Sequence, residues 1–152
     1  MEYQIKAAYI YNFAKFVDWP AQAFVSTNAP MVIGVLGEND FGSYLKQIIS
    51  GREINGHQLQ FVKFDSAAQA TNCQVLFISA SEKSHLSKIL DQLKGASILT
   101  VSETDNFIGD GGMIYLFLDE ENKVRFQINN DAARKAGLVI SSKLLSLAAN
   151  NQ

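Results

Sequence analysis

Residues 31–51 read MVIGVLGENDFGSYLKQIISG, and this stretch decides the fold class that the sequence predicts. Its first seven residues form a continuous apolar run, which is typical of a strand buried on both faces. A helix is expected to begin near Asn39 or Asp40 and to continue to Ser50, because Gly51 then ends it. A strand followed directly by a helix is the repeating unit of a parallel sheet.

The same alternation continues along the chain. QVLFIS (74–79) and ASILTVS (96–102) are two more apolar strands. The segment 81–95 between them predicts a helix with Ser81 as its N-cap and Gly95 at its end. The apolar stripe of this helix consists of Leu86, Ile89, Leu90 and Leu93.

The C-terminal third changes this pattern. MIYLFLD (113–119) and VRFQIN (124–129) are separated by only four residues, so they must form an antiparallel hairpin. Two short helices are expected at 129–137 and 141–150, the second capped by Ser141 or Ser142. We therefore predict a single α/β domain over residues 1–152. Its expected architecture is a three-layer sandwich, with a mostly parallel mixed sheet flanked by helices and the antiparallel hairpin near the C-terminus.

The first helix carries an unusual number of aromatic residues. The sequence predicts it from about residue 3 to 18, ending before Trp19 and Pro20. On a helical wheel the apolar face comprises Ile5, Tyr9, Phe13, Phe16 and Val17, joined by Ile10 and Ala14. Tyr11 falls on the polar stripe. We therefore expect Tyr9, Phe13 and Phe16 in the core, and Tyr11, Trp19 and Pro20 as candidates for contact with a partner protein.

Composition and charge argue against two classes of protein. The chain has 13 Lys and Arg against 15 Asp and Glu, with no basic cluster to neutralise phosphates, so no nucleic acid partner is expected. No apolar run approaches the roughly 20 residues that cross a bilayer. The first residues lack a signal-peptide pattern. This leaves a cytoplasmic protein, or an exported one whose signal peptide has been replaced by Met1.

Motifs for nucleotide or phosphoryl chemistry are missing. The glycines of GVLGENDFG (34–42) do not have G-x-G-x-x-G spacing, and Glu38 and Asp40 place negative charge where phosphates would bind. A phosphoacceptor receiver needs an aspartate after a central strand, but the strand 74–79 ends in serine.

Catalytic and metal sites are equally hard to find. His57 and His85 lack a nucleophile or ligand partner at a recognisable spacing. Cys73 is the single cysteine, so neither an intramolecular disulfide nor a thiolate zinc cluster can form. The turn GDGG (109–112) fits either glycines at positive φ or an anion-binding nest. We expect no catalytic residue, no metal and no cofactor.

Three stretches together resemble one family. They are KAAYIYNFAKFVDWP (6–20), then IGVLGENDFG (33–42) with CQVLFIS (73–79), and finally TVSETDNFIGDGGMI (100–114) with RFQINNDAARKAGLVISSKLLSLA (125–148). Their order and spacing are similar to those of the YfiR family, also called DUF4154.

The resemblance implies a periplasmic protein, exported by a signal peptide that has been removed, which inhibits an inner-membrane diguanylate cyclase by binding its periplasmic part. This would keep cyclic di-GMP low and restrain biofilm formation. An outer-membrane lipoprotein as a second partner, a homodimer, and action on another membrane sensor such as a histidine kinase are also implied. Better known members carry internal disulfides, which the lone Cys73 does not allow here.

Two alternatives remain open at this point: an enzyme of a kind not recognisable from motifs, and a small-ligand-binding sensor domain. Open α/β sheets usually hold ligands at the carboxyl ends of their strands. The residues expected to gather at that edge are Glu38, Asp40, Ser79, Ser81 and Ser102.

Overall fold

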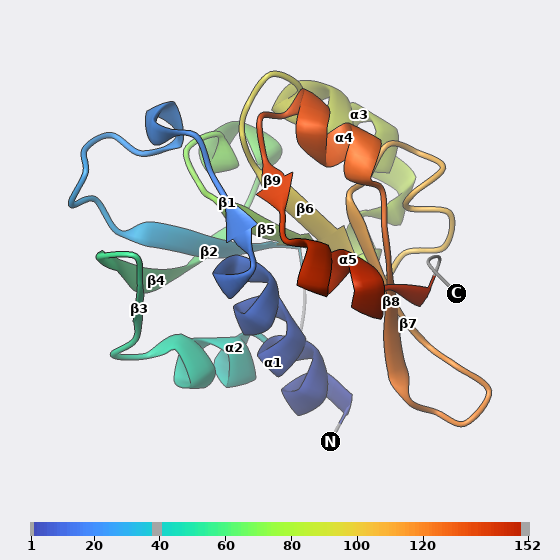
Figure 1. Ribbon diagram of the computed structural model, residues 1–152. Helices are drawn as coiled ribbons and strands as arrows, with labels where there is room; N and C mark the ends of the chain where they lie inside the picture. The colour runs from blue at the N-terminus through green and yellow to red at the C-terminus, as the bar shows by residue number, and fades with distance from the viewer. Residues whose placement is uncertain (1, 38–40, 150–152) are drawn as a thin grey trace.

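The computed structural model describes residues 2–37 and 41–149 (Figure 1). The α-helices are α1 (Glu2–Lys15), α2 (Gly42–Ile49), α3 (Leu86–Leu93), α4 (Asn130–Lys135) and α5 (Ser142–Leu147). The strands are β1 (Val17–Asp18), β2 (Met31–Leu36), β3 (Glu53–Ile54), β4 (His57–Phe64), β5 (Val75–Ile78), β6 (Leu99–Ser102), β7 (Ile114–Leu118), β8 (Val124–Ile128) and β9 (Val139–Ile140). Three 3₁₀ helices complete the described elements: η1 (Ala21–Ala23), η2 (Ala67–Ala70) and η3 (Ala80–His85).

Seven strands form the central sheet, in the order β3-β4-β2-β5-β6-β7-β8. The five inner strands, from β4 to β7, run parallel to one another, while β3 and β8 are antiparallel edge strands. The inner strands β2, β5 and β6 are the apolar runs that the sequence marked. The predicted hairpin is β7–β8, with Leu118 opposite Val124. The mostly parallel mixed sheet is therefore confirmed.

Helices cover both faces of this sheet, which confirms the three layers. Side chains from alternate strand positions join one core cluster with α1, α2, α4 and α5, and the other positions join a second cluster with α3 and η2. Within β2, for example, Ile33 and Val35 belong to the first cluster and Leu36 to the second. Figure 1 shows α1 and α2 side by side beneath the sheet and α3 beside α4 at the top of the view.

Asn55 and Gly56 form a tight turn, in which both residues have positive φ (52° and 85°). It joins β4 to a short strand that the sequence analysis did not identify, β3, with Ile54 opposite His57. The helix after β2 is also present, but its expected start at Asn39 or Asp40 lies outside the described residues, and α2 begins at Gly42.

The first helix is shorter than predicted, because α1 ends at Lys15 rather than near residue 18. Val17 and Asp18 instead form β1, which pairs with the distant strand β9 through Val17 opposite Ile140. The backbone carbonyl of Phe16 also accepts a hydrogen bond from Ser141 N at 2.8 Å. Pairing between remote segments thus overrides local helical preference.

The buried face of α1 also differs from the helical-wheel prediction. Phe13, Ile10, Ala14 and Val17 are buried as expected. Ile5, however, is 42% exposed, and Tyr9 and Phe16 are only half-buried. Lys6 takes an inward position and is 3% exposed. A wheel drawn from hydrophobicity cannot place a buried lysine, because the carboxylates that compensate its charge lie partly in another element.

The predicted helix 81–95 is divided into η3 and α3, and its N-cap is not Ser81. Ser79 holds the cap position, where its Oγ accepts a hydrogen bond from Ser81 N at 3.3 Å. In contrast, the prediction of Ser141 as the cap of the last helix is confirmed, because its Oγ accepts from Lys143 N at 3.1 Å.

Candidate functional site

The surface at the C-terminal end of α1 carries alternating cations and aromatic rings. The Tyr11 ring lies beneath Arg52 and Lys15, with cation-to-centroid distances of 5.0 and 5.3 Å. The Phe16 ring is approached by Lys15 at 5.9 Å and by Lys143 at 5.5 Å. We refer to these five residues, Arg52, Tyr11, Lys15, Phe16 and Lys143, as the cation–aromatic row.

Local structure explains how the row is assembled. Tyr11 and Lys15 are one helical turn apart and so lie on the same side of α1. Arg52 follows α2, and its Nε donates a 2.7 Å hydrogen bond to Ile48 O, which holds the guanidinium near Tyr11. Lys143 comes from the first turn of α5, which the hydrogen bond from Ser141 to Phe16 draws toward α1. Tyr11 was predicted from the sequence as a contact residue, but the three cations were not, because they come from three parts of the chain.

The charge of the row is locally uncompensated. Within residues 2–37 and 41–149, none of Lys15, Arg52 and Lys143 forms an ion pair. The whole chain has a net charge of −2, so the row is a positive feature on a mildly acidic protein. Attraction to the face of an aromatic ring orients a cation without neutralising it. The row is therefore suited to meet negative charge on another molecule.

Trp19 and Pro20 lie in a different environment from Tyr11. Trp19 is half-buried, and its Nε1 donates to Gln74 O at 3.1 Å, just before β5. Pro20 lies beside Gly137, where a Cβ added to the glycine would be 3.5 Å from Cγ of the proline ring. Trp19 thus has a tertiary hydrogen bond of its own, and the role of Trp19 and Pro20 in partner contact stays a prediction.

The carboxyl edge of the sheet brings the three predicted serines together. Ser79 directly follows β5 and caps the turn that carries Ser81, and Ser102 lies on β6 opposite Ile78. Ser102 Oγ donates to Ile78 O at 2.7 Å and lies 2.9 Å from Thr104 Oγ1. Ser79 and Ser102 are buried, so their hydroxyls are engaged in structure. Glu38 and Asp40 lie outside the described residues, and a ligand cleft at this edge stays a prediction.

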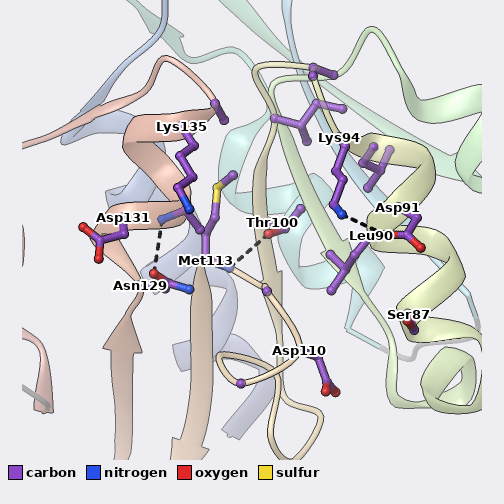
Figure 2. Close-up of a pocket in the computed structure, with 18 residues that line it drawn as sticks. Ser87, Leu90, Asp91, Lys94, Thr100, Asp110, Met113, Asn129, Asp131 and Lys135 are labelled. Atoms are coloured by element: carbon purple, nitrogen blue, oxygen red, sulfur yellow. Dashed lines mark hydrogen bonds and ion pairs between the residues drawn. The ribbon is translucent and has the colours of Figure 1, made fainter.

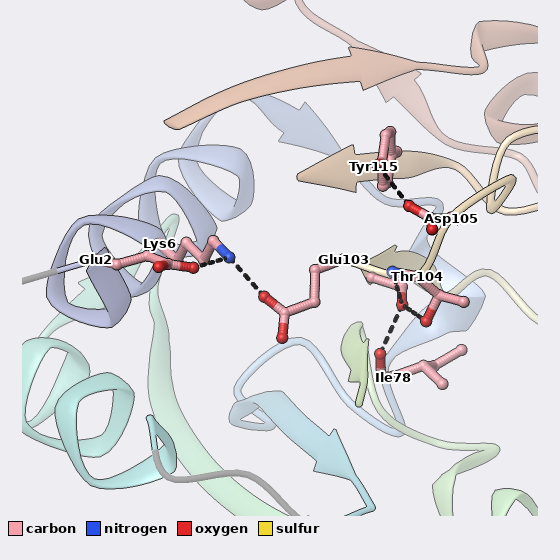
Figure 3. Close-up of polar contacts among 8 residues, drawn as sticks. Glu2, Lys6, Ile78, Glu103, Thr104, Asp105 and Tyr115 are labelled. Atoms are coloured by element: carbon pink, nitrogen blue, oxygen red, sulfur yellow. Dashed lines mark hydrogen bonds and ion pairs between the residues drawn. The ribbon is translucent and has the colours of Figure 1, made fainter. Parts of the chain in front are cut away.

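The structure also shows a charged cluster, absent from the sequence prediction, near the end of β6 (Figure 3). Lys6 Nζ lies 2.5 Å from both Glu103 Oε2 and Glu2 Oε2. Burial alone lowers the pKa of Lys6, but hydrogen bonds to Glu103 and Glu2 outweigh it, and the pKa is raised overall. The Lys6 charge is therefore compensated inside the fold, as a buried charge must be. One indication of this cluster was present in the sequence, because Lys6 is the first residue of the first family motif and Glu103 lies within the third.

Several kinds of chemistry find no site in the described part of the chain. No group of three or more His, Cys, Asp or Glu that could hold a metal occurs there. Cys73 is buried and unpaired, and burial raises the pKa of its thiol to about 12, so a reactive thiolate is not available. Among the same residues, no helix has both the length and the apolar character needed to span a membrane.

The profile of the YfiR/HmsC-like family (DUF4154) matches residues 3–149. The chain belongs to this family. YfiR/HmsC-like proteins are periplasmic regulators rather than catalysts, and they act on partner proteins. The resemblance inferred from the three motifs is thereby confirmed.

A solved structure shares the fold of this YfiR/HmsC-like chain. It is a conserved domain protein from Vibrio cholerae O1 biovar El Tor strain N16961, with a TM-score of 0.65 and 14% sequence identity. The alignment covers 97% of this chain but only 59% of the Vibrio chain, so the latter contains substantially more structure. Among curated proteins, no match was found.

Proposed function

We propose that this protein acts in the periplasm, where it binds and inhibits a membrane-anchored signalling protein, specifically a diguanylate cyclase. The observation that carries the proposal is the family match over residues 3–149. Inhibition would lower cyclic di-GMP and so restrain biofilm formation. An outer-membrane lipoprotein that competes for the inhibitor, and a homodimer, belong to the same proposal.

The cation–aromatic row supports the partner-binding part of this function. Its three cations, which have no ion pair within the described residues, and its two rings form a continuous strip. Such a strip suits an acidic segment in the periplasmic part of the cyclase. Charges are screened over about 8 Å at physiological ionic strength, so a narrow acidic segment responds to the row alone. A wide anionic surface would also meet the acidic remainder of the chain, which disfavours a membrane surface as the occupant.

Co-expression with a membrane diguanylate cyclase tests the proposal. We expect the wild-type protein to co-purify with the cyclase from detergent-solubilised membranes and to lower cellular cyclic di-GMP. Lys15→Glu reverses the central charge of the row and should weaken both effects at least tenfold. Lys88→Glu makes the same charge change on the exposed surface of α3 and should behave as wild type.

The controls separate two kinds of failure. If the wild-type protein neither binds a cyclase nor changes cyclic di-GMP, inhibition of a cyclase is wrong. If the wild-type protein does both, and the Lys15→Glu and Lys88→Glu variants bind and inhibit the cyclase equally well, the function stands and the row is not the contact surface. Binding of the wild-type protein to anionic lipid vesicles, lost in Lys15→Glu, would also contradict an acidic protein segment as the occupant.

A second candidate function is a sensor domain that binds a small ligand and acts on a histidine kinase or another receptor. The observation that favours it is a cavity of about 430 Å³ between α3 and α4, within the size range of ligand sites. The test is to measure autophosphorylation of the receptor kinase in complex with this protein, with and without ligand. The sensor function predicts that the ligand changes the rate of autophosphorylation, and an unchanged rate contradicts it.

A further inference from the structure

The cavity between α3 and α4 has a defined chemical character (Figure 2). One wall comes from α3 and the residues that follow it, and the opposite wall comes from α4. Thr100 and Met113 lie between these walls, where Thr100 Oγ1 accepts a 3.1 Å hydrogen bond from Met113 N. This site is distinct from the carboxyl edge of the sheet, where the sequence predicted a ligand cleft.

Three carboxylates line the cavity, but each is already engaged. Asp91 pairs with Lys94 at 3.2 Å, and Asp131 pairs with Arg134 at 2.7 Å and is directed away from the cavity in Figure 2. Asp110 accepts a 3.2 Å hydrogen bond from Asn106 Nδ2. Two of the three negative charges at the rim are therefore paired with a cation, and Asp110 is held by a neutral amide.

Two donors remain available on the α4 wall. Lys135 forms no ion pair with any described residue, and its side chain extends toward Met113 in Figure 2. Asn129 uses its Oδ1 to cap α4, accepting from Ala132 N at 3.1 Å, and its Nδ2 amide donates to no described residue. An ammonium and an amide on one wall are the donors that a carboxylate requires.

The other lining groups restrict the ligand further. Leu90, Leu93, Ile98 and Met113 supply the apolar part of the lining. The turn 109–112 also borders the cavity, but the amides of residues 110–112 donate to the carbonyls of residues 106–108. The anion-binding nest considered for GDGG is therefore not formed. The alternative interpretation, a glycine at positive φ, is confirmed by Gly111 at φ 104°.

We propose that this cavity binds a small organic anion, whose carboxylate is held by Lys135 and Asn129 and whose apolar body rests on Leu90, Ile98 and Met113. This inference rests on the sensor function above, which it deepens, and is independent of cyclase inhibition. A free phosphate lacks the apolar body, and a neutral amide lacks the charge, so both should bind more weakly.

Titration of the purified protein with benzoate and hexanoate, followed by backbone amide NMR, tests the proposal. Saturable shifts are expected at residues that border the cavity, including Ala96, Gly111 and Ala132. Benzamide, hexanamide and inorganic phosphate should bind at least tenfold more weakly. Lys135→Gln removes one exposed charge and should weaken carboxylate binding at least tenfold, while leaving the amides unaffected.

Lys88→Gln is the matched control, because Lys88 is exposed on α3 and does not line the cavity. The proposal is overturned if neither carboxylate produces saturable shifts at the cavity, or if Lys135→Gln and Lys88→Gln bind carboxylates equally. Carboxylate binding at the cavity without any effect on a receptor would refute the sensor function and leave the site intact.

Discussion

Lys6 Nζ lies 2.5 Å from Glu103 Oε2, although 97 residues separate them in the chain. The contact joins the first turns of α1 to the segment that leaves β6, and Glu2 adds a second carboxylate one turn away on α1 (Figure 3). Lys6 is almost completely buried, whereas the Glu103 side chain keeps 18% of its surface exposed. The pair therefore anchors α1 to the carboxyl end of the sheet.

Lys6 and Glu103 should contribute to stability in a coupled way, so that their removal is not additive. Lys6→Met leaves two carboxylates without their cation and should lower the free energy of unfolding by about 2–3 kcal/mol. This cost is smaller than the cost of breaking a fully buried ion pair, because solvent reaches Glu103. The double variant Lys6→Met/Glu103→Gln should be less destabilised than the sum of the single variants. Urea unfolding of all four proteins measures this coupling, and strict additivity would show that the contact contributes nothing.

The same pair predicts a loss of stability in strong base. Its hydrogen bonds raise the folded-state pKa of Lys6 above the ordinary 10.5, so the charged form is favoured by folding. The resulting stabilisation is fully present below 10.5 and is lost as pH rises through the raised pKa. The difference in unfolding free energy between wild type and Lys6→Met should thus be constant at neutral pH and shrink in strong base. If the difference in unfolding free energy instead grows in strong base, the folded-state pKa of Lys6 is not raised and the prediction is wrong.

Phe13 should be among the most sensitive positions of α1. It is fully buried, with its ring centroid 5.1 Å from that of Phe126 and 6.0 Å from that of Tyr9. Phe13→Ala should cost about 3–5 kcal/mol, because it removes a large buried group and leaves a cavity. Ile5→Ala on the same helix should cost less than about 1 kcal/mol, since Ile5 is 42% exposed. Thermal unfolding compares them, and similar melting temperatures would refute this difference.

Cys73 should be inert in the native state. The residue is 3% exposed and burial raises its thiol pKa to about 12. A thiol reagent at neutral pH should modify the native protein only as fast as it opens, and should modify the thiol at once in urea. Non-reducing electrophoresis should show no disulfide-linked dimer. Modification of the native protein at the rate of a small free thiol would place Cys73 at the surface.

The sequence predicted those features that depend on neighbouring residues. Apolar runs such as 74–79 mark buried parallel strands, and the short connection between 113–119 and 124–129 requires a hairpin. The Ser141 cap follows from the local preference of a serine side chain to accept a hydrogen bond from the first turn of a helix. The family motifs were equally readable, because their order and spacing are properties of the chain.

Other features required the fold, since their partners are remote. Val17 and Asp18 have helical neighbours, but they become a strand because Val139 and Ile140 offer a second strand beside them. Lys6 is stable inside only because Glu103 arrives from another element.

The candidate sites divide in the same way. Tyr11 was recognisable on the polar side of the first helix, whereas Arg52 reaches the Tyr11 ring from the end of α2 and Lys143 reaches the Phe16 ring from α5. The α3–α4 cavity combines residues from segments that no sequence spacing relates. The sequence alone therefore determined the main helices, the inner strands, the sheet type and the family. Only the tertiary structure decided which charges are buried, which are left unpaired, and where a ligand fits, because electrostatic compensation depends on distances in space and not along the chain.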